Sequence, residues 1–128
     1  MTPEQRKLKR ARLIQRVRAV ERSQSAAAAS EAEATRARLS GVAERTRSLA
    51  QHYSRQDGAL VASDLRSGKV MRDHLQQLSQ ISAQQAQEAD ERSEVVRQEF
   101  AQSDRRLRRA EEDTRDLVRQ IVTALAKD

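Results

Sequence analysis

The sequence contains no cysteine, one proline, three glycines and two aromatic side chains in 128 residues. Without cysteine, the chain forms no disulfide and no thiolate metal site. With only Tyr53 and Phe100 as aromatic residues, it lacks the large side chains that usually fill the core of a compact globule. The single proline stands at position 3, so nothing after it interrupts a helix in the way proline does. These absences favour an elongated structure with little interior.

Long apolar runs are also missing. No stretch approaches the ~20 apolar residues that a membrane-spanning helix needs. We expect no secretory signal, because no uninterrupted apolar segment follows the first basic residues. Residues 6–22 are rich in arginine and poor in acids, as mitochondrial presequences are. The helical apolar pattern runs through this segment, however, which favours its being part of the folded chain.

The residues that are present favour helices. Hydrophobic residues make up 37% and charged residues 34% of the chain, a balance that also occurs in disordered proteins. Strong helix formers dominate, and apolar residues recur every three or four positions from Gln5 to about Tyr53 and from Met71 to Lys127. Gly58 and Gly68 lie between these stretches. We therefore predict an all-α fold: two long helices in one antiparallel coiled-coil hairpin, with helix one at about 4–54, a connection at about 55–69 and helix two at about 70–127.

Each predicted helix has an apolar stripe that would face the other. In the first helix the stripe comprises Leu13, Val17, Val20, Gln24, Ala28, Ala32, Thr35, Leu39, Val42, Thr46, Leu49 and Tyr53. In the second it comprises Met71, Leu75, Leu78, Ser82, Gln85, Ala89, Arg92, Val96, Phe100, Ser103, Leu107, Ala110, Thr114, Leu117, Ile121 and Ala124. Steps of four, four and three near Gln24 and Arg92 predict a locally unwound supercoil. A turn near residue 61 would place Leu39 opposite the region of Ile81 and Ala83.

Charge is unevenly distributed along the chain. Residues 1–22 hold eight Lys or Arg against two acids, and a second basic cluster, RRLRR, occupies residues 105–109. Residues 61–104 hold five basic residues against eight acids. In a hairpin the two basic clusters would lie side by side. They fit a solvated face with intrahelical ion pairs, a nucleic-acid contact, or docking into an acidic protein collar. The lack of stacking aromatic residues disfavours nucleic acid.

Catalytic and metal-binding patterns are absent. Ser67-Gly68-Lys69 lacks the earlier glycine and the final Ser or Thr of a phosphate-binding loop. His52 and His74 have no second ligand at helical spacing, which is typical of ordinary histidines. We therefore expect a non-enzyme without cofactor, metal or small-molecule substrate.

The layout resembles the small coiled-coil stalk proteins of flagellar and virulence type III secretion, the FliJ/YscO family. The likeness includes the basic first helix, the arginine-rich end of the second, and the segment at 70–85, VMRDHLQQLSQISAQQ. This resemblance implies a cytoplasmic protein, peripheral at the inner-membrane export apparatus, that inserts into a hexameric secretion ATPase and links it to an export-gate protein and export chaperones. The implied gate-contacting residues are His74, Leu75, Leu78, Ile81 and Gln85. Leu75, Leu78 and Ile81 also fit the predicted stripe.

By charge clustering, the ATPase-ring contact would comprise Arg6, Arg10, Arg12, Arg16, Arg105, Arg106, Arg108 and Arg109. Two other functions remain open at this point. One is a scaffold that self-associates into a four-helix bundle through apolar residues outside the stripe, and the other is a basic nucleic-acid-binding rod. We do not favour nucleic acid.

Overall fold

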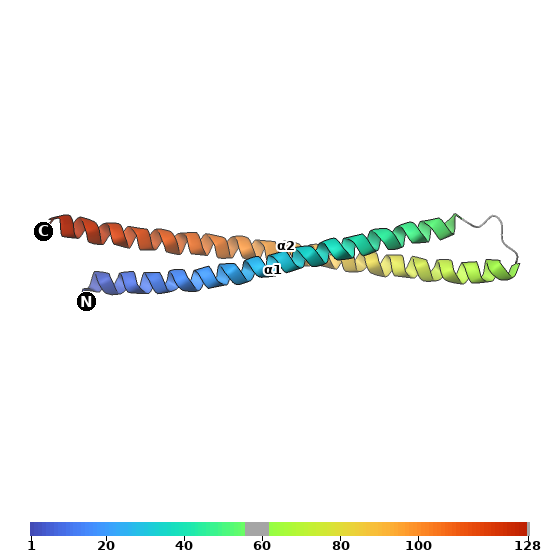
Figure 1. Ribbon diagram of the computed structural model, residues 1–128, viewed down its shortest axis with the longest axis horizontal. Coiled ribbons are helices and arrows are strands. Elements are labelled where there is room, and N and C mark those ends of the chain that lie inside the picture. The colour runs from blue at the N-terminus through green and yellow to red at the C-terminus, as the bar shows by residue number, and fades with distance from the viewer. Residues whose placement is uncertain (56–61, 128) are drawn as a thin grey trace. The chain divides into compact units, whose positions relative to one another are not determined.

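The described chain is helical. The computed structural model describes residues 1–55 and 62–127, which form α1 (Pro3–Ser54) and α2 (Ala62–Lys127), two long helices that pack against each other (Figure 1). The bounds of α1 agree with the prediction. The second helix begins at Ala62, so the prediction that 62–69 belong to the connection is wrong. Gly68 is accommodated within α2, because a helical glycine costs only about 1 kcal/mol and its neighbours favour helix. Residues 56–61, which include Gly58 of the predicted connection, lie outside the described residues.

The N-terminus of α1 is capped by a reciprocal pair of hydrogen bonds. The backbone N–H of Gln5 donates to Thr2 Oγ1 at 3.2 Å, and the backbone N–H of Thr2 donates to Gln5 Oε1 at 3.1 Å. This is the capping-box arrangement, and Pro3 occupies the first helical position, where its missing N–H costs nothing. The cap predicts little fraying at the start of α1.

The chain forms two compact units. The first comprises residues 1–30 and 95–128, and the second comprises residues 31–94. Both helices contribute to each unit. We refer to them as unit 1 and unit 2 and describe the contacts of each separately.

The stripe of α2 that is shielded from solvent follows an uninterrupted heptad pattern. Its steps alternate between four and three without exception. It comprises Gly68, Arg72, Leu75, Ser79, Ser82, Ala86, Ala89, Ser93, Val96, Phe100, Ser103, Leu107, Ala110, Thr114, Leu117 and Ile121. The predicted steps of four, four and three near Arg92 are therefore wrong, because Ser93 is buried and Arg92 is exposed.

In α1 the shielded stripe differs from the predicted one. It also alternates steps of three and four: Leu8, Ala11, Gln15, Arg18, Arg22, Ser25, Ala29, Ala32, Arg36, Leu39, Ala43, Thr46 and Ala50. The predicted positions Leu13, Val17, Val20, Gln24 and Ala28 are all exposed. The prediction that they face α2, and the irregular step near Gln24, are wrong. The structure uses mainly alanine and polar side chains at the shielded positions there.

Contacts between the helices establish their register. In unit 1, Arg22 contacts Asp104 and Ser25 contacts Ser103. In unit 2, Arg36 lies 3.7 Å from Asp90, and Thr46 lies 3.4 Å from Ser82. In both units the partner's number in α2 falls as the number in α1 rises. Leu39 lies between the last two contacts, so its predicted place opposite the region of Ile81 and Ala83 is wrong by about one to two turns.

The shielded interior is thin, as expected of two helices. Among the residues whose burial the structure describes, Leu75, Ala89, Val96 and Ala110 are the buried apolar ones, and Val96 is 2% exposed. Two serines, Ser82 and Ser93, are buried beside them. No residue of α1 reaches the same degree of burial. Most of the helix surface is therefore available to solvent or to partners.

Candidate partner-binding surfaces

The five predicted gate-contacting residues divide into two groups in unit 2. Leu75 is 7% exposed and belongs to the shielded stripe of α2. Leu78 and Ile81 are 50% and 52% exposed, and His74 and Gln85 are exposed as well. The last four lie at steps of four, three and four, so they share one helix face. Leu75 supports the packing of α2 on α1, and the other four are available to a partner.

Uncharged residues surround this face. Residues 74–87 contain no Lys, Arg, Asp or Glu, in a chain of which 34% is charged. A solvated coiled-coil surface normally carries charges at these positions. Half-exposed Leu78 and Ile81 in an uncharged segment are thus more typical of a contact surface than of a surface that only faces water.

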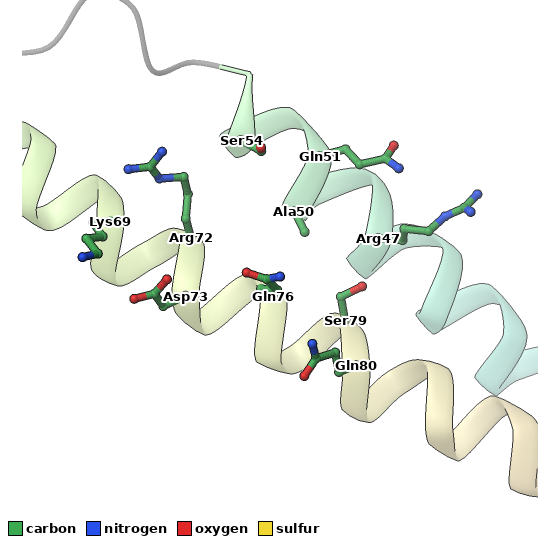
Figure 2. Close-up of a pocket in the computed structure, with 10 residues that line it drawn as sticks. All are labelled: Arg47, Ala50, Gln51, Ser54, Lys69, Arg72, Asp73, Gln76, Ser79 and Gln80. Carbon is green, nitrogen blue, oxygen red and sulfur yellow. The ribbon is translucent and has the colours of Figure 1, made fainter.

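The opposite side of the helix pair in unit 2 is polar. A groove there is lined from α1 by Arg47, Gln51 and Ser54, and from α2 chiefly by Lys69, Asp73 and Gln80 (Figure 2). On both helices these side chains lie to one side of the shielded stripe. Counting residues around each helix places Leu78 and Ile81 on the other side of the stripe.

The side with Leu78 and Ile81 also includes apolar residues of α1. Val42, Leu49 and Tyr53 are 36%, 50% and 38% exposed. They lie on the side of the α1 stripe that is away from the polar groove. The register brings Leu49 level with the region of Leu78. We call the set Val42, Leu49, Tyr53, Leu78 and Ile81 the apolar face of unit 2. The spacing of Val42, Leu49 and Tyr53 also fits a seam, which is why the sequence pattern predicted that they face the other helix.

Unit 1 holds all eight arginines of the predicted ring contact, and each of them is exposed. Arg108 donates from Nε to Asp104 Oδ2 at 3.0 Å, an i,i+4 pair within α2. The other seven form no ion pair with any residue that the structure describes. Unpaired guanidinium groups on one unit provide a positive surface that can attract an acidic partner.

Asp104 is the centre of the electrostatic contacts in unit 1. Arg22 Nε donates to Asp104 Oδ1 at 2.7 Å, and this hydrogen bond is the main cause that lowers the pKa of Asp104 below its ordinary value. Desolvation opposes the shift, whereas the charges of Arg108, Arg22 and Arg105 add to it. The Arg22 guanidinium carbon also lies 5.4 Å from the centre of the Phe100 ring, which is a cation–π distance. Arg22 thus joins α1 to two residues of α2.

A comparable network stands in unit 2. Arg36 donates to Glu33 at 2.6 Å, and Ser93 donates to the same carboxylate at 3.3 Å from α2. The hydrogen bond and the charge of Glu33, with a smaller contribution from Asp90, raise the pKa of Arg36. Sequence reasoning did not identify Arg22, Arg36 or Asp104, although each lies at a heptad position or beside one. Their role could not be recognised from the apolar pattern, because a charged residue at or beside a seam position interrupts that pattern.

The described residues show no site for metal chemistry or for crossing a membrane. Among them, no group of three His, Asp or Glu side chains could hold a metal ion. His52 packs edge-on against its neighbour Tyr53, with ring centres 5.8 Å apart. Neither helix, over the part of it that is described, has a segment both apolar and long enough to span a bilayer. No protein-family model, no curated protein and no solved structure matches this chain.

Proposed function

We propose that this protein is a non-catalytic adaptor, an antiparallel coiled-coil hairpin that links a hexameric secretion ATPase to an export gate, as its resemblance to the FliJ/YscO proteins implies. The observation that carries the proposal is the exposure of Leu78 and Ile81. A hairpin that only held its own helices together would gain stability by burying such side chains. Their position on the apolar face of unit 2 supports a role in binding the gate protein.

The arginines of unit 1 support the second half of the proposal. They are exposed, and seven of the eight form no ion pair with a described residue. Charges of this kind contribute little to folding but steer a partner of opposite charge and fix its orientation. The proposed partner is the acidic inner surface of an ATPase ring. Export chaperones would bind as further partners, and the protein would be peripheral to the membrane through these proteins.

The first experiment measures ATP hydrolysis and ring assembly by a type III secretion ATPase with added protein. Wild type is compared with a variant in which Arg105, Arg106, Arg108 and Arg109 are replaced by Glu. In the matched control, Glu replaces four exposed arginines outside the two basic clusters: Arg38, Arg45, Arg55 and Arg66. The control therefore changes the net charge by the same amount. We expect stimulation by wild type and by the control, and loss of stimulation in the cluster variant. Equal loss in both variants would show an effect of net charge alone and would contradict a ring contact at this cluster.

The second experiment measures binding to the cytoplasmic domain of the gate protein. Leu78→Asp with Ile81→Asp should reduce binding by about tenfold or more, because each change places a carboxylate in an apolar contact. Val95→Asp, at a residue of unit 1 that is 47% exposed, is the control and should leave binding unchanged. Retained binding by the double variant would remove the gate contact from the proposal.

A scaffold that self-associates is a second candidate function. Val118, Val122 and Leu125 are 37%, 58% and 70% exposed near the C-terminal end of α2, and such residues could pack on another copy. A nucleic-acid-binding role gains no comparable support, because the structure adds no stacking surface to the arginines.

A further inference from the structure

Three large apolar residues of α1 in unit 1 lie on the side of the helix away from α2. Ala11, Gln15 and Arg18 belong to the shielded stripe of α1. Leu13, Val17 and Val20 each follow one of these by two residues, which is a rotation of about 200° around the helix. They are 50%, 55% and 56% exposed. We call these three residues the outer stripe. Their steps of four and three are those of a helix-packing surface.

The outer stripe is bordered by positive charge. Residues 5–20 contain seven Lys or Arg and no Asp or Glu. Lys9 and Arg16 lie along one edge of the stripe, and Arg6 and Arg10 precede it on the same face. Leu13, together with Leu8, lines a shallow hollow whose other walls include Lys9, Arg12 and Arg16. The hydrophobic stripe and its basic border therefore form one surface.

We propose that the outer stripe binds one amphipathic helix of a partner protein, whose own apolar stripe is bordered by Asp and Glu. Charge selects this occupant. A second copy of the same segment would bring seven further cations against the first seven, with like charges at Arg6 and Arg10 in the line of contact. A helix with acidic edges would instead pair with Lys9, Arg10 and Arg16 while its apolar residues cover Leu13, Val17 and Val20. The partner would thus pack on the outside of α1 as a third helix.

This inference deepens the proposed function, because Arg6, Arg10, Arg12 and Arg16 belong to the predicted ring contact. It changes the nature of that contact. Charge alone would accept any acidic surface, whereas the outer stripe requires a helix with apolar residues at heptad spacing. Steering by the arginines would govern the rate of association, and burial of the outer stripe would hold the complex together.

The test uses two synthetic peptides of about 21 residues, each with Leu and Ile at heptad positions. One has Glu at the flanking positions and the other has Lys. Binding to the full chain is measured by fluorescence anisotropy at about 50 mM and at about 300 mM salt, which differ strongly in screening. We expect the Glu peptide to bind and the Lys peptide not to bind. In Leu13→Gln with Val17→Gln, the Kd for the Glu peptide should rise by about tenfold or more at both salt concentrations.

The matched control is Val95→Gln with Val122→Gln, which removes two exposed apolar residues of unit 1 outside the outer stripe. This variant should bind the Glu peptide as wild type does. Equal binding by Leu13→Gln with Val17→Gln would show that charge alone holds the peptide and would overturn the proposal. If wild type self-associates and Leu13→Gln with Val17→Gln does not, the occupant of the outer stripe is a second copy of the chain. If Leu13→Gln with Val17→Gln has a much lower melting temperature than wild type, the outer stripe is packed inside the fold. Either result also overturns the proposal. None of these measurements involves an ATPase, so their failure is distinct from failure of the proposed function.

Discussion

Arg22 shows how one residue determines local packing in this protein. It lies at a position where an apolar side chain is usual, yet it reaches both Asp104 and Phe100 on α2. Its guanidinium group makes both contacts, although the side chain is 42% exposed. Two further single residues have consequences that can be measured: Asp104, through its carboxylate, and Gly41, through its missing side chain.

The Arg22–Asp104 contact predicts a dependence of stability on acid pH. Because the pKa of Asp104 in the folded state lies below its ordinary value, which is about 3.9, its carboxylate stabilises the fold at pH values above that value. This contribution is lost as the pH falls through the folded-state pKa. Asp104→Asn should therefore lower the melting temperature at pH 6, and the difference from wild type should shrink toward pH 2. Asp116→Asn, which removes one member of an exposed pair within α2, is the control and should change little. A constant difference across the pH range would contradict this origin.

Gly41 lies within α1, and nothing near it requires glycine. A Cβ built at this position would meet only the Arg45 side chain, at an ordinary distance of 3.6 Å. Its backbone has no positive φ. Gly41→Ala should therefore raise the free energy of unfolding by about 0.5–1 kcal/mol, measured by urea denaturation. Ala27→Gly, at an exposed site of the same helix, should lower it by a similar amount. A loss of stability in Gly41→Ala would indicate that a partner or a second copy packs closely there.

At the scale of the element, the two helices contribute differently to the seam, because the buried side chains come from α2. The strict heptad of α2 includes Leu75, Val96 and Ala110, all buried. The matching stripe of α1 is built mainly from alanine, serine and charged residues and contains no residue of comparable burial. Contacts between polar groups, such as Ser25 Oγ to Ser103 Oγ at 2.9 Å, provide register at this seam. Stability should therefore depend more on the large residues of α2 than on those of α1.

Leu75 and Leu78 test this difference within one turn of α2. Leu75 is 7% exposed and Leu78 is 50% exposed. Leu75→Ala should lower the free energy of unfolding by about 2 kcal/mol, and Leu78→Ala by less than about 1 kcal/mol, since it removes a side chain that is already half in water. Chemical denaturation followed by circular dichroism measures both. Equal losses would mean that Leu78 is packed in the seam, as the sequence pattern alone suggested.

At the scale of the whole molecule, the two units present different surfaces. Unit 1 carries the two basic clusters and the outer stripe, and unit 2 carries the apolar face beside the uncharged residues 74–87. The net charge is +6, with much of the positive charge near the two termini of the chain. A protein with this distribution can recognise two unlike partners. Self-association through unit 1 would instead bring like charges together.

Sedimentation equilibrium distinguishes the adaptor from the self-associating scaffold. We expect the mass of a single chain, 14.5 kDa, at low salt. Repulsion between the basic clusters opposes assembly of copies when it is least screened. Raising the salt concentration to about 300 mM should leave the monomer in place, although the repulsion is then largely screened. A stable dimer at low salt would contradict the adaptor as we propose it and would favour a four-helix bundle.

The sequence by itself determined that this chain is helical, where α1 ends and which side of α2 is shielded at Leu75, Ser82, Ala89, Val96 and Ala110. Helix formers, one early proline and a sustained apolar spacing suffice for those conclusions, because they depend on local preferences and on one helix at a time. The exposure of the eight arginines followed from their charge.

Only the tertiary structure decided which side of α1 meets α2. Leu13, Val17 and Val20 have the spacing of a seam, but so do Ala11, Gln15, Arg18 and Arg22. The choice depends on the partner helix, because Arg22 contacts Asp104 and Phe100 on α2. A stripe is a property of one helix, whereas a seam is a property of two. For the same reason the half-exposure of Leu78 and Ile81, on which the proposed function depends, could not be read from their spacing.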